Sequence, residues 1–157
     1  MMMRYDCLIH EKLLHTDEIP GAVISLKLQG FYPANDQHDL PNYSFFMMFA
    51  DKIIGKITLR LGYNELTMIQ GHIGYEIDEA YRGYGYSYYA LSMILELARA
   101  HGYQSVLVTC DPSNVRSIKL VLKVGGKMIY HLKEVPKDHI YYVLGITHLN
   151  VYSIDLV

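Results

Sequence analysis

The stretch that most constrains the fold of this chain is residues 75–102, YEIDEAYRGYGYSYYALSMILELARAHG. It begins as a strand-like run, continues through a turn with two glycines, and enters an amphipathic helix without a linker. The helix carries one apolar stripe, typical of a face that packs on a core, formed by Ala90, Leu91, Ile94, Leu95 and Ala98. A strand that leads directly into such a helix predicts an α/β unit in which the helix covers a sheet.

The turn itself, residues 82–87 (RGYGYS), has the character of an anion site. Its backbone N–H groups stand at the start of a helix, where the first N–H groups have no intrahelical partner. Together with the helix dipole, such groups favour phosphate. The turn lacks the Lys-Ser/Thr pair of an ATP loop and the third glycine of a dinucleotide site. It therefore predicts a phosphorylated ligand without identifying it.

Composition restricts the class of protein. The 157 residues suffice for one domain, and 51% apolar with 19% charged residues is typical of a globular chain. A net charge of −2 argues against broad binding to nucleic acid or to anionic membranes. Cys7 and Cys110 are too few for a disulfide scaffold and lack metal-ligand spacing. With no signal peptide and no long apolar run, we expect a cytoplasmic protein without a metal site or a membrane span.

The first half of the chain predicts an antiparallel meander of three strands, over residues 43–50, 53–61 and 71–77. A tight turn at Asp51-Lys52 joins the first two. Residues 22–28 alternate weakly, so helix and strand both stay open there. Residues 31–42 are rich in Pro, Asn and Asp and predict a loop, and residues 62–70 predict a polar connection.

The second half predicts a strand over residues 105–110, a helix that ends at Gly125-Gly126, and strands over residues 127–132 and 140–146. A right-handed crossover through the helix at residues 84–101 makes its flanking strands parallel. We therefore expect a mixed α/β (α+β) fold, with a mostly antiparallel central sheet and helices on both faces. The alternating tail, residues 149–157, either extends the last strand or pairs with a second copy in a homodimer.

The second helix carries polar side chains on one face. Asn114, Ser117 and Val121 share that face at i, i+3 and i+7. Asn114 suits an N-cap, and Ser117 suits a solvated position. The same two side chains also suit a ligand held between the two helices, and the residues alone leave both interpretations open.

Together the two motifs resemble those of the GNAT (GCN5-related) N-acetyltransferase family. YRGYGYSYYAL is similar to the family's acyl-CoA signature, Arg/Gln-x-x-Gly-x-Gly/Ala, with Ser87 in the last small position. Residues 114–126 are similar to its second motif, an Asn-x-x-Ser helix that ends in glycine. The motifs stand in the family's order about 30 residues apart, and the resemblance covers residues 43–130 of a single domain over residues 1–157.

The resemblance implies a GNAT-like fold and acetyl-CoA as cosubstrate, with direct transfer of the acetyl group to a primary amine. The N–H groups implied to hold the pyrophosphate of coenzyme A belong to Arg82, Gly83, Tyr84, Gly85, Tyr86 and Ser87. The resemblance also implies that the strand segment of Tyr75 and Ile77 pairs with the pantetheine arm, and that Asn114 and Ser117 contact the cofactor from the second helix.

The acid and the base of this reaction are less defined. Many members of the family carry a tyrosine on the second helix as general acid, and Val121 occupies that position here. Glu76 is the candidate base for the ammonium proton, with His72 four residues earlier on the same strand face if the strand is regular. A water relay from either residue is equally open, because glutamate has a reference pKa of about 4.3 and is a weak base near neutrality.

Two functions from different classes fit these observations. The first is an N-acetyltransferase, and the alternative is an acyl-CoA-binding domain without turnover. No motif identifies the acceptor, a small-molecule or peptide amine. Residues 21–42, 62–70 and those after 133 would shape its pocket, where Asp36 and Asp39 could attract a cationic amine.

Overall fold

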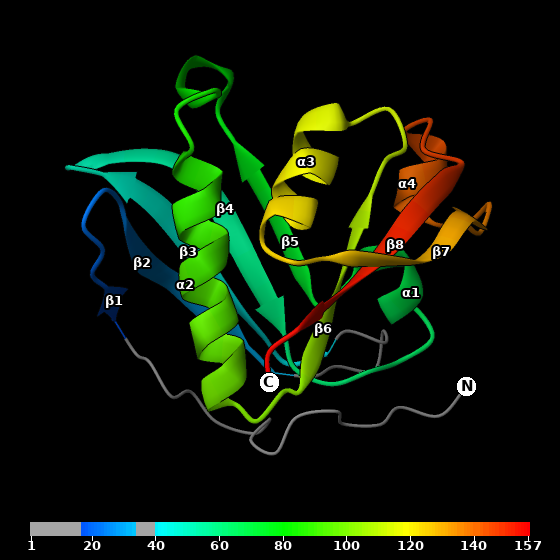
Figure 1. Ribbon diagram of the computed structural model, residues 1–157, viewed down its shortest axis with the longest axis horizontal. Helices are drawn as coiled ribbons and strands as arrows, with labels where there is room; N and C mark the ends of the chain where they lie inside the picture. The colour runs from blue at the N-terminus through cyan, green and yellow to red at the C-terminus, as the bar shows by residue number, and fades with distance from the viewer. Residues whose placement is uncertain (1–16, 34–39) are drawn as a thin grey trace.

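The structure is a computed structural model that describes residues 17–33 and 40–157. Within these ranges the chain forms a five-stranded sheet in the order β1-β2-β3-β4-β5 and a three-stranded sheet in the order β6-β8-β7 (Figure 1). Every strand pair in both sheets is antiparallel. The predicted class, a mixed and mostly antiparallel α+β fold, is confirmed.

The five-stranded sheet contains β1 (Glu18–Ile19), β2 (Ser25–Tyr32), β3 (Asn42–Phe49), β4 (Lys52–Arg60) and β5 (Ile73–Ile77). The predicted meander corresponds to β3, β4 and β5, and the undecided residues 22–28 lie partly in β2. The predicted polar connection, residues 62–70, contains a short helix, α1 (Thr67–Gln70). The predictions for Cys7, Asp36 and Asp39 lie outside the described residues.

Helix α2 (Tyr86–Ala100) covers one face of this sheet. Alternation along β3 buries three side chains completely, namely Tyr43, Phe45 and Met47. The apolar stripe predicted for the helix is also buried, since all five of its side chains belong to the same core cluster as these strand residues. This packing fixes the direction in which α2 leaves the glycine turn.

Strands β5 and β6 (Ser105–Cys110) run in the same direction, meet near their starts and then diverge (Figure 1). The His72 N–H donates to the Leu107 carbonyl at 2.8 Å, and the Leu107 N–H donates to Nδ1 of His72 at 2.9 Å. Beyond this point no strand pairing joins β5 to β6 among the residues that the structure describes. The two strands therefore form a V that opens toward their carboxyl ends.

The three-stranded sheet differs from the prediction in its last strand. Residues 140–146 are not a strand: they form the short helix α4 (Ile140–Val143) and a turn at Gly145. His139 caps this helix by accepting the Tyr141 N–H on its Nδ1 at 3.1 Å. Gly145 has a φ of +95°, which ends the helix in a conformation that favours glycine. The run IYYVLGI is apolar throughout, so it shows neither the 3.6-residue period of a helix nor the two-residue period of a strand. The sequence pattern therefore could not reveal this helix.

The strand that completes the sheet is β8 (His148–Asp155), which lies between β6 and β7 (Lys127–Glu134). Both of its edges are paired, and Val151, Tyr152 and Ile154 are buried. The proposal that the tail at residues 149–157 pairs with a second copy is therefore wrong for this strand. Instead, the tail forms the centre of its own sheet.

No helix in residues 17–33 and 40–157 is long and apolar enough to cross a membrane. In the same ranges no three His, Cys, Asp or Glu side chains gather in an arrangement that could hold a metal ion.

Candidate functional site

The glycine turn follows the end of β5 directly. The Asp78 N–H donates to the Ile54 carbonyl at 2.8 Å, which holds the strand end on β4, and a 3₁₀ turn (Glu79–Tyr81) leads to the motif. Gly83 and Gly85 have φ values of +88° and +80°, and Gly85 is the N-cap of α2. In the described chain the N–H groups of residues 83–87 donate no backbone hydrogen bond. They remain available to an anion.

The turn is open on its outer side. A Cβ added at Gly83 or Gly85 would meet no atom within 4 Å. Tyr84 is 67% exposed and stacks on Tyr86, with 5.6 Å between the ring centroids. Arg82 is exposed and its Nε donates to the Ile77 carbonyl at 3.4 Å. A ligand can therefore approach the backbone directly, as a phosphate cradle requires.

Three side chains meet across the V between β5 and β6. The Tyr75 hydroxyl on β5 lies 2.6 Å from Oγ of Ser117, which belongs to α3 (Val115–Lys123). The same Oγ lies 3.2 Å from Sγ of Cys110, at the end of β6. These contacts join β5, β6 and α3 at one point. We call Tyr75, Ser117 and Cys110 the hydroxyl–thiol cluster.

Burial keeps this cluster neutral. It raises the pKa of Tyr75 to about 12, although the hydrogen bond to Ser117 acts in the opposite direction. Burial also raises the pKa of the Cys110 thiol. Cys110 is 3% exposed and therefore a buried packing thiol, and a protonated thiol is a poor nucleophile.

Asn114 caps α3, as one of the two interpretations predicted. Its Oδ1 accepts the Ser117 N–H at 3.2 Å. This bond uses the amide oxygen and leaves the NH₂ group able to donate to a ligand. Capping and ligand contact are therefore compatible in this residue.

Val121 faces the core of the protein. Its side chain is completely buried, and a Cβ added at Gly126 would lie 2.5 Å from its Cγ1. The position has neither a proton donor nor space for a larger side chain. The acid that many family members carry on this helix is absent from it here.

Glu76 and His72, the two candidate bases, lie in different surroundings. Glu76 is exposed, with its Cα opposite that of Lys56 on β4, and it points to the opposite face of the strand from Tyr75. His72 is 2% exposed at the start of β5, about 13 Å from Glu76 at the usual rise of a strand. The structure therefore does not bring the two side chains together.

His72 acts as a hydrogen-bond acceptor within the fold. Burial lowers its pKa to about 4, the charge of Arg60 also lowers it, and the Gly62 backbone acts in the opposite direction. Its Nδ1 accepts the Leu107 N–H, which only the neutral ring can do. Its Nε2 is buried without a hydrogen-bond partner in the described residues. A charged His72 is therefore incompatible with the contact between β5 and β6.

This arrangement predicts a loss of stability in acid. The unfolded ring, with a pKa of 6.5, binds a proton before the folded ring does, so the free energy of unfolding falls as the pH drops from about 6.5 to about 4. The loss is on the order of 3 kcal/mol. Urea unfolding across this range should show a smaller loss in His72→Gln, whose amide oxygen can accept the Leu107 N–H without titrating. If the free energy of unfolding fell equally steeply with pH in the wild type and in His72→Gln, the loss of stability would not come from His72.

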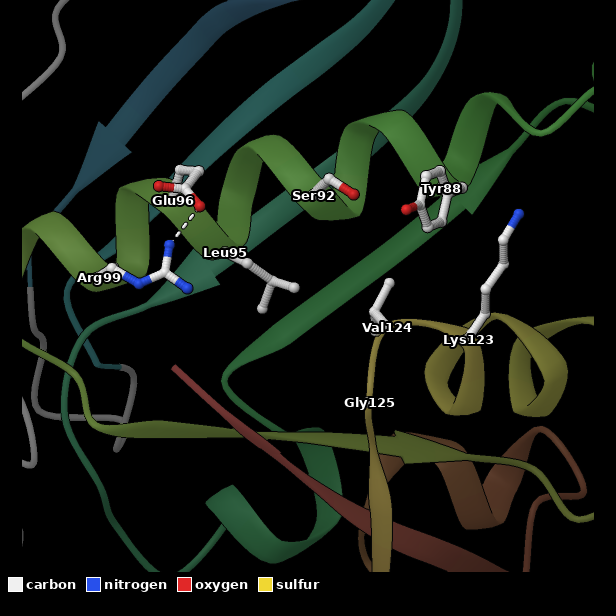
Figure 2. Close-up of a pocket in the computed structure, with 8 residues that line it drawn as sticks. All are labelled: Tyr88, Ser92, Leu95, Glu96, Arg99, Lys123, Val124 and Gly125. Atoms are coloured by element: carbon white, nitrogen blue, oxygen red, sulfur yellow. Dashed lines mark hydrogen bonds and ion pairs between the residues drawn. The ribbon is translucent and has the colours of Figure 1, made fainter. Parts of the chain in front are cut away.

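A cavity of about 450 Å³ lies between α2 and the end of α3 (Figure 2). It is lined by Tyr88, Ser92, Leu95, Glu96, Arg99, Lys123, Val124 and Gly125. The Lys123 ammonium lies 4.2 Å from the centroid of the Tyr88 ring, at the end nearer the glycine turn, and an ion pair joins Glu96 to Arg99 at the other. The sequence did not predict this cavity, in which four of the five α2 residues, Tyr88, Ser92, Glu96 and Arg99, lie outside the apolar stripe.

A family model described as acetyltransferase (GNAT) domain matches residues 17–127. No curated protein sequence matches the chain. Among solved structures, the apo form of RimL, a ribosomal L7/L12 alpha-N-protein acetyltransferase, superimposes with a TM-score of 0.63 and 14% identity over 89% of this chain and 98% of its own.

Two further structures are similar. An N-acetyltransferase from Staphylococcus aureus Mu50 gives a TM-score of 0.58 at 24% identity, over 74% of this chain and 68% of its own. The microcin C7 self-immunity acetyltransferase MccE, in complex with acetyl-CoA and AMP, gives 0.57 at 19% identity over 73% of this chain. The chain spans 61% of the length of MccE. These likenesses show a shared fold.

Proposed function

Because the chain belongs to the GNAT acetyltransferase family, we propose that it transfers an acetyl group from acetyl-CoA to a primary amine. The observation that carries the proposal is that two features lie next to each other at the carboxyl end of β5. One is the open turn with free N–H groups, and the other is the V between β5 and β6. In this proposal the turn holds the pyrophosphate and the V holds the pantetheine arm.

The edge of β5 supports the proposed position of the arm. In the described residues β5 pairs only with β4, through Ile57 opposite Tyr75 and Gly55 opposite Ile77. Its other edge faces the V, where an extended ligand can form backbone-like hydrogen bonds with it. From α3, the Ser117 hydroxyl reaches within 2.6 Å of the Tyr75 hydroxyl, and Asn114 is the N-cap of the same helix.

The transfer itself needs no nucleophile from the protein. A neutral amine attacks the thioester carbonyl, so the protein must orient both groups, polarise the carbonyl and receive the ammonium proton. We propose Glu76, acting through water, as the group that receives this proton, because it is the exposed member of the candidate pair. His72 is buried and its Nδ1 is already occupied by Leu107.

The acceptor classes to test are chosen from the chemistry of the reaction and from the descriptions of the relatives. RimL is described as acting on the α-amine of a ribosomal protein, which makes a peptide N-terminus the first acceptor class to test. Small-molecule amines form the second class.

The proposal predicts that acetyl-CoA stabilises the protein and is consumed when an acceptor amine is present. At 100 times its Kd the cofactor adds about 2.7 kcal/mol, which raises Tm by about 5–10 °C for a chain of this size. The measurements are thermal unfolding with acetyl-CoA or pantetheine, and release of free thiol with a panel of peptide α-amines, amino acids and polyamines. Pantetheine lacks the pyrophosphate and should give the smaller shift.

Two other outcomes are informative. A shift in Tm without thiol release from any amine would favour the acyl-CoA-binding domain without turnover. No shift with acetyl-CoA would contradict both functions.

A further inference from the structure

We infer that Tyr75 supplies the proton for the departing thiolate of coenzyme A, by way of Ser117. The inference rests on the proposed acetyl transfer. It assigns to β5 the role of proton donor that Val121 on α3 cannot have.

The geometry of the hydroxyl–thiol cluster carries the inference. The separation of 2.6 Å between the Tyr75 and Ser117 oxygens is that of a strong O–H···O hydrogen bond. Ser117 is held in place because its N–H is bound to Asn114. Its oxygen also lies 3.2 Å from the Cys110 sulfur, so in this structure a hydroxyl already lies at hydrogen-bond distance from a sulfur atom inside the V.

All three groups of the cluster can donate a hydrogen bond, and the inference uses one of the possible directions. A tyrosine that keeps its proton can donate to the Ser117 oxygen, and this frees the Ser117 O–H to donate onward. In this structure the Cys110 sulfur lies 3.2 Å from the Ser117 oxygen, within reach of such a donor. With the pantetheine arm in the V, the acceptor becomes the sulfur of the cofactor.

The proton transfer balances without another reactant. As the carbon–sulfur bond of the tetrahedral intermediate breaks, the Ser117 O–H bond breaks and an S–H bond forms on coenzyme A. In the same step the Tyr75 proton moves to the Ser117 oxygen, which restores the serine. The tyrosinate then recovers a proton from water.

The alternative is that the Tyr75–Ser117 bond only holds β5 to α3. That role would make Tyr75→Phe less stable but would leave the chemical step unchanged. The titratable neighbour in the cluster, Cys110, is a buried thiol and would be unaltered in both cases.

The test compares Tyr75→Phe, Ser117→Ala and Ser117→Thr with the wild type, using the best amine of the acceptor panel. We expect Tyr75→Phe and Ser117→Ala each to lower kcat about 100-fold, the lower range for a lost general acid. In Tyr75→Phe, which keeps the backbone edge of β5, the KM for acetyl-CoA should change less than threefold. The double variant should be no slower than the slower single variant, because the two residues act in one path. Ser117→Thr keeps the hydroxyl and should retain most of the activity.

A second measurement separates proton donation from structure. Fluorinated tyrosines at position 75 lower the pKa of the phenol without altering its shape, and the alkaline limb of the kcat profile should move to lower pH with them. A kcat for Tyr75→Phe within threefold of the wild type, or an alkaline limb that does not move, would overturn the inference alone. Absence of turnover in the wild type would overturn the proposed function, and the inference with it.

Discussion

Replacement of Gly85 by valine is expected to weaken acetyl-CoA binding about 100-fold, a loss of about 2.7 kcal/mol. Gly85 has a φ of +80°, a conformation that a β-branched residue rarely adopts, so the turn must change shape. The free N–H groups on both sides of it would then no longer converge on the pyrophosphate. Each hydrogen bond from such a group to a charged oxygen contributes about 1.5–3 kcal/mol, so losing one or two accounts for the effect.

The control for this prediction is Gly145→Val. Gly145 has a φ of +95° and equally open surroundings, but it lies in the turn after α4. Both variants should lose about 1–2 kcal/mol of stability from backbone strain. Only Gly85→Val should lose affinity in calorimetric titration with acetyl-CoA. Equal affinities in the two variants would contradict the proposed role of the turn.

Replacement of Gly71 by alanine is expected to be among the most destabilising single changes in the chain, by at least about 3 kcal/mol. Gly71 has a φ of +73° and a ψ of 175°, a region essentially restricted to glycine. A Cβ there would lie 2.9 Å from the Leu107 carbonyl oxygen. The change therefore combines backbone strain with a clash at the point where β5 and β6 meet. A drop of about 6–12 °C in Tm is the expected result.

Gly74→Ala provides the matched control on the same strand. A Cβ at Gly74 would meet only the Arg60 guanidinium, at 3.5 and 3.9 Å, and this flexible group can move. Its Tm should change by no more than about 2 °C, since the native backbone at this strand position does not require the conformational freedom of glycine. Similar losses in the two variants would mean that the contact between β5 and β6 contributes little to stability.

Local patterns were sufficient to predict most of the elements. The strand over residues 43–50 and the helical stripe around Leu91 and Ile94 are signals within one element, and both appear as predicted. The glycine turn was also recognisable, because Gly83 and Gly85 adopt positive φ values that other residues avoid.

What the sequence did not reveal depends on contacts between distant residues. Residues 140–146 are apolar throughout, and only the cap at His139 and the turn at Gly145 make α4 from them. The contact that joins the start of β5 to β6 depends on the fit of Gly71 against Leu107. Neither α4 nor the contact between β5 and β6 produces a periodic pattern in the local sequence from which it could be predicted.

The candidate site also contains both kinds of feature, those set by a local sequence motif and those set by contacts between distant residues. The glycine turn that we propose to hold the pyrophosphate is a local motif, whereas the bond between Tyr75 and Ser117 joins residues 42 positions apart. Glu76 lies in β5 and His72 directly precedes that strand, and the two differ in burial because only the chain at the start of β5 is covered by β6. Strand alternation alone could not distinguish these two ends.

The central position of β8 has a consequence for the order in which the protein can fold during synthesis. Strands β6 and β7 do not pair with each other, and Ser105 finds its partner only when Asp155 has been made. Pairings this distant in sequence form slowly. The glycine turn and α2 therefore leave the ribosome long before the sheet that supports Ser117 can close. Acetyl-CoA should consequently protect the finished chain, and not the nascent one, from proteolysis.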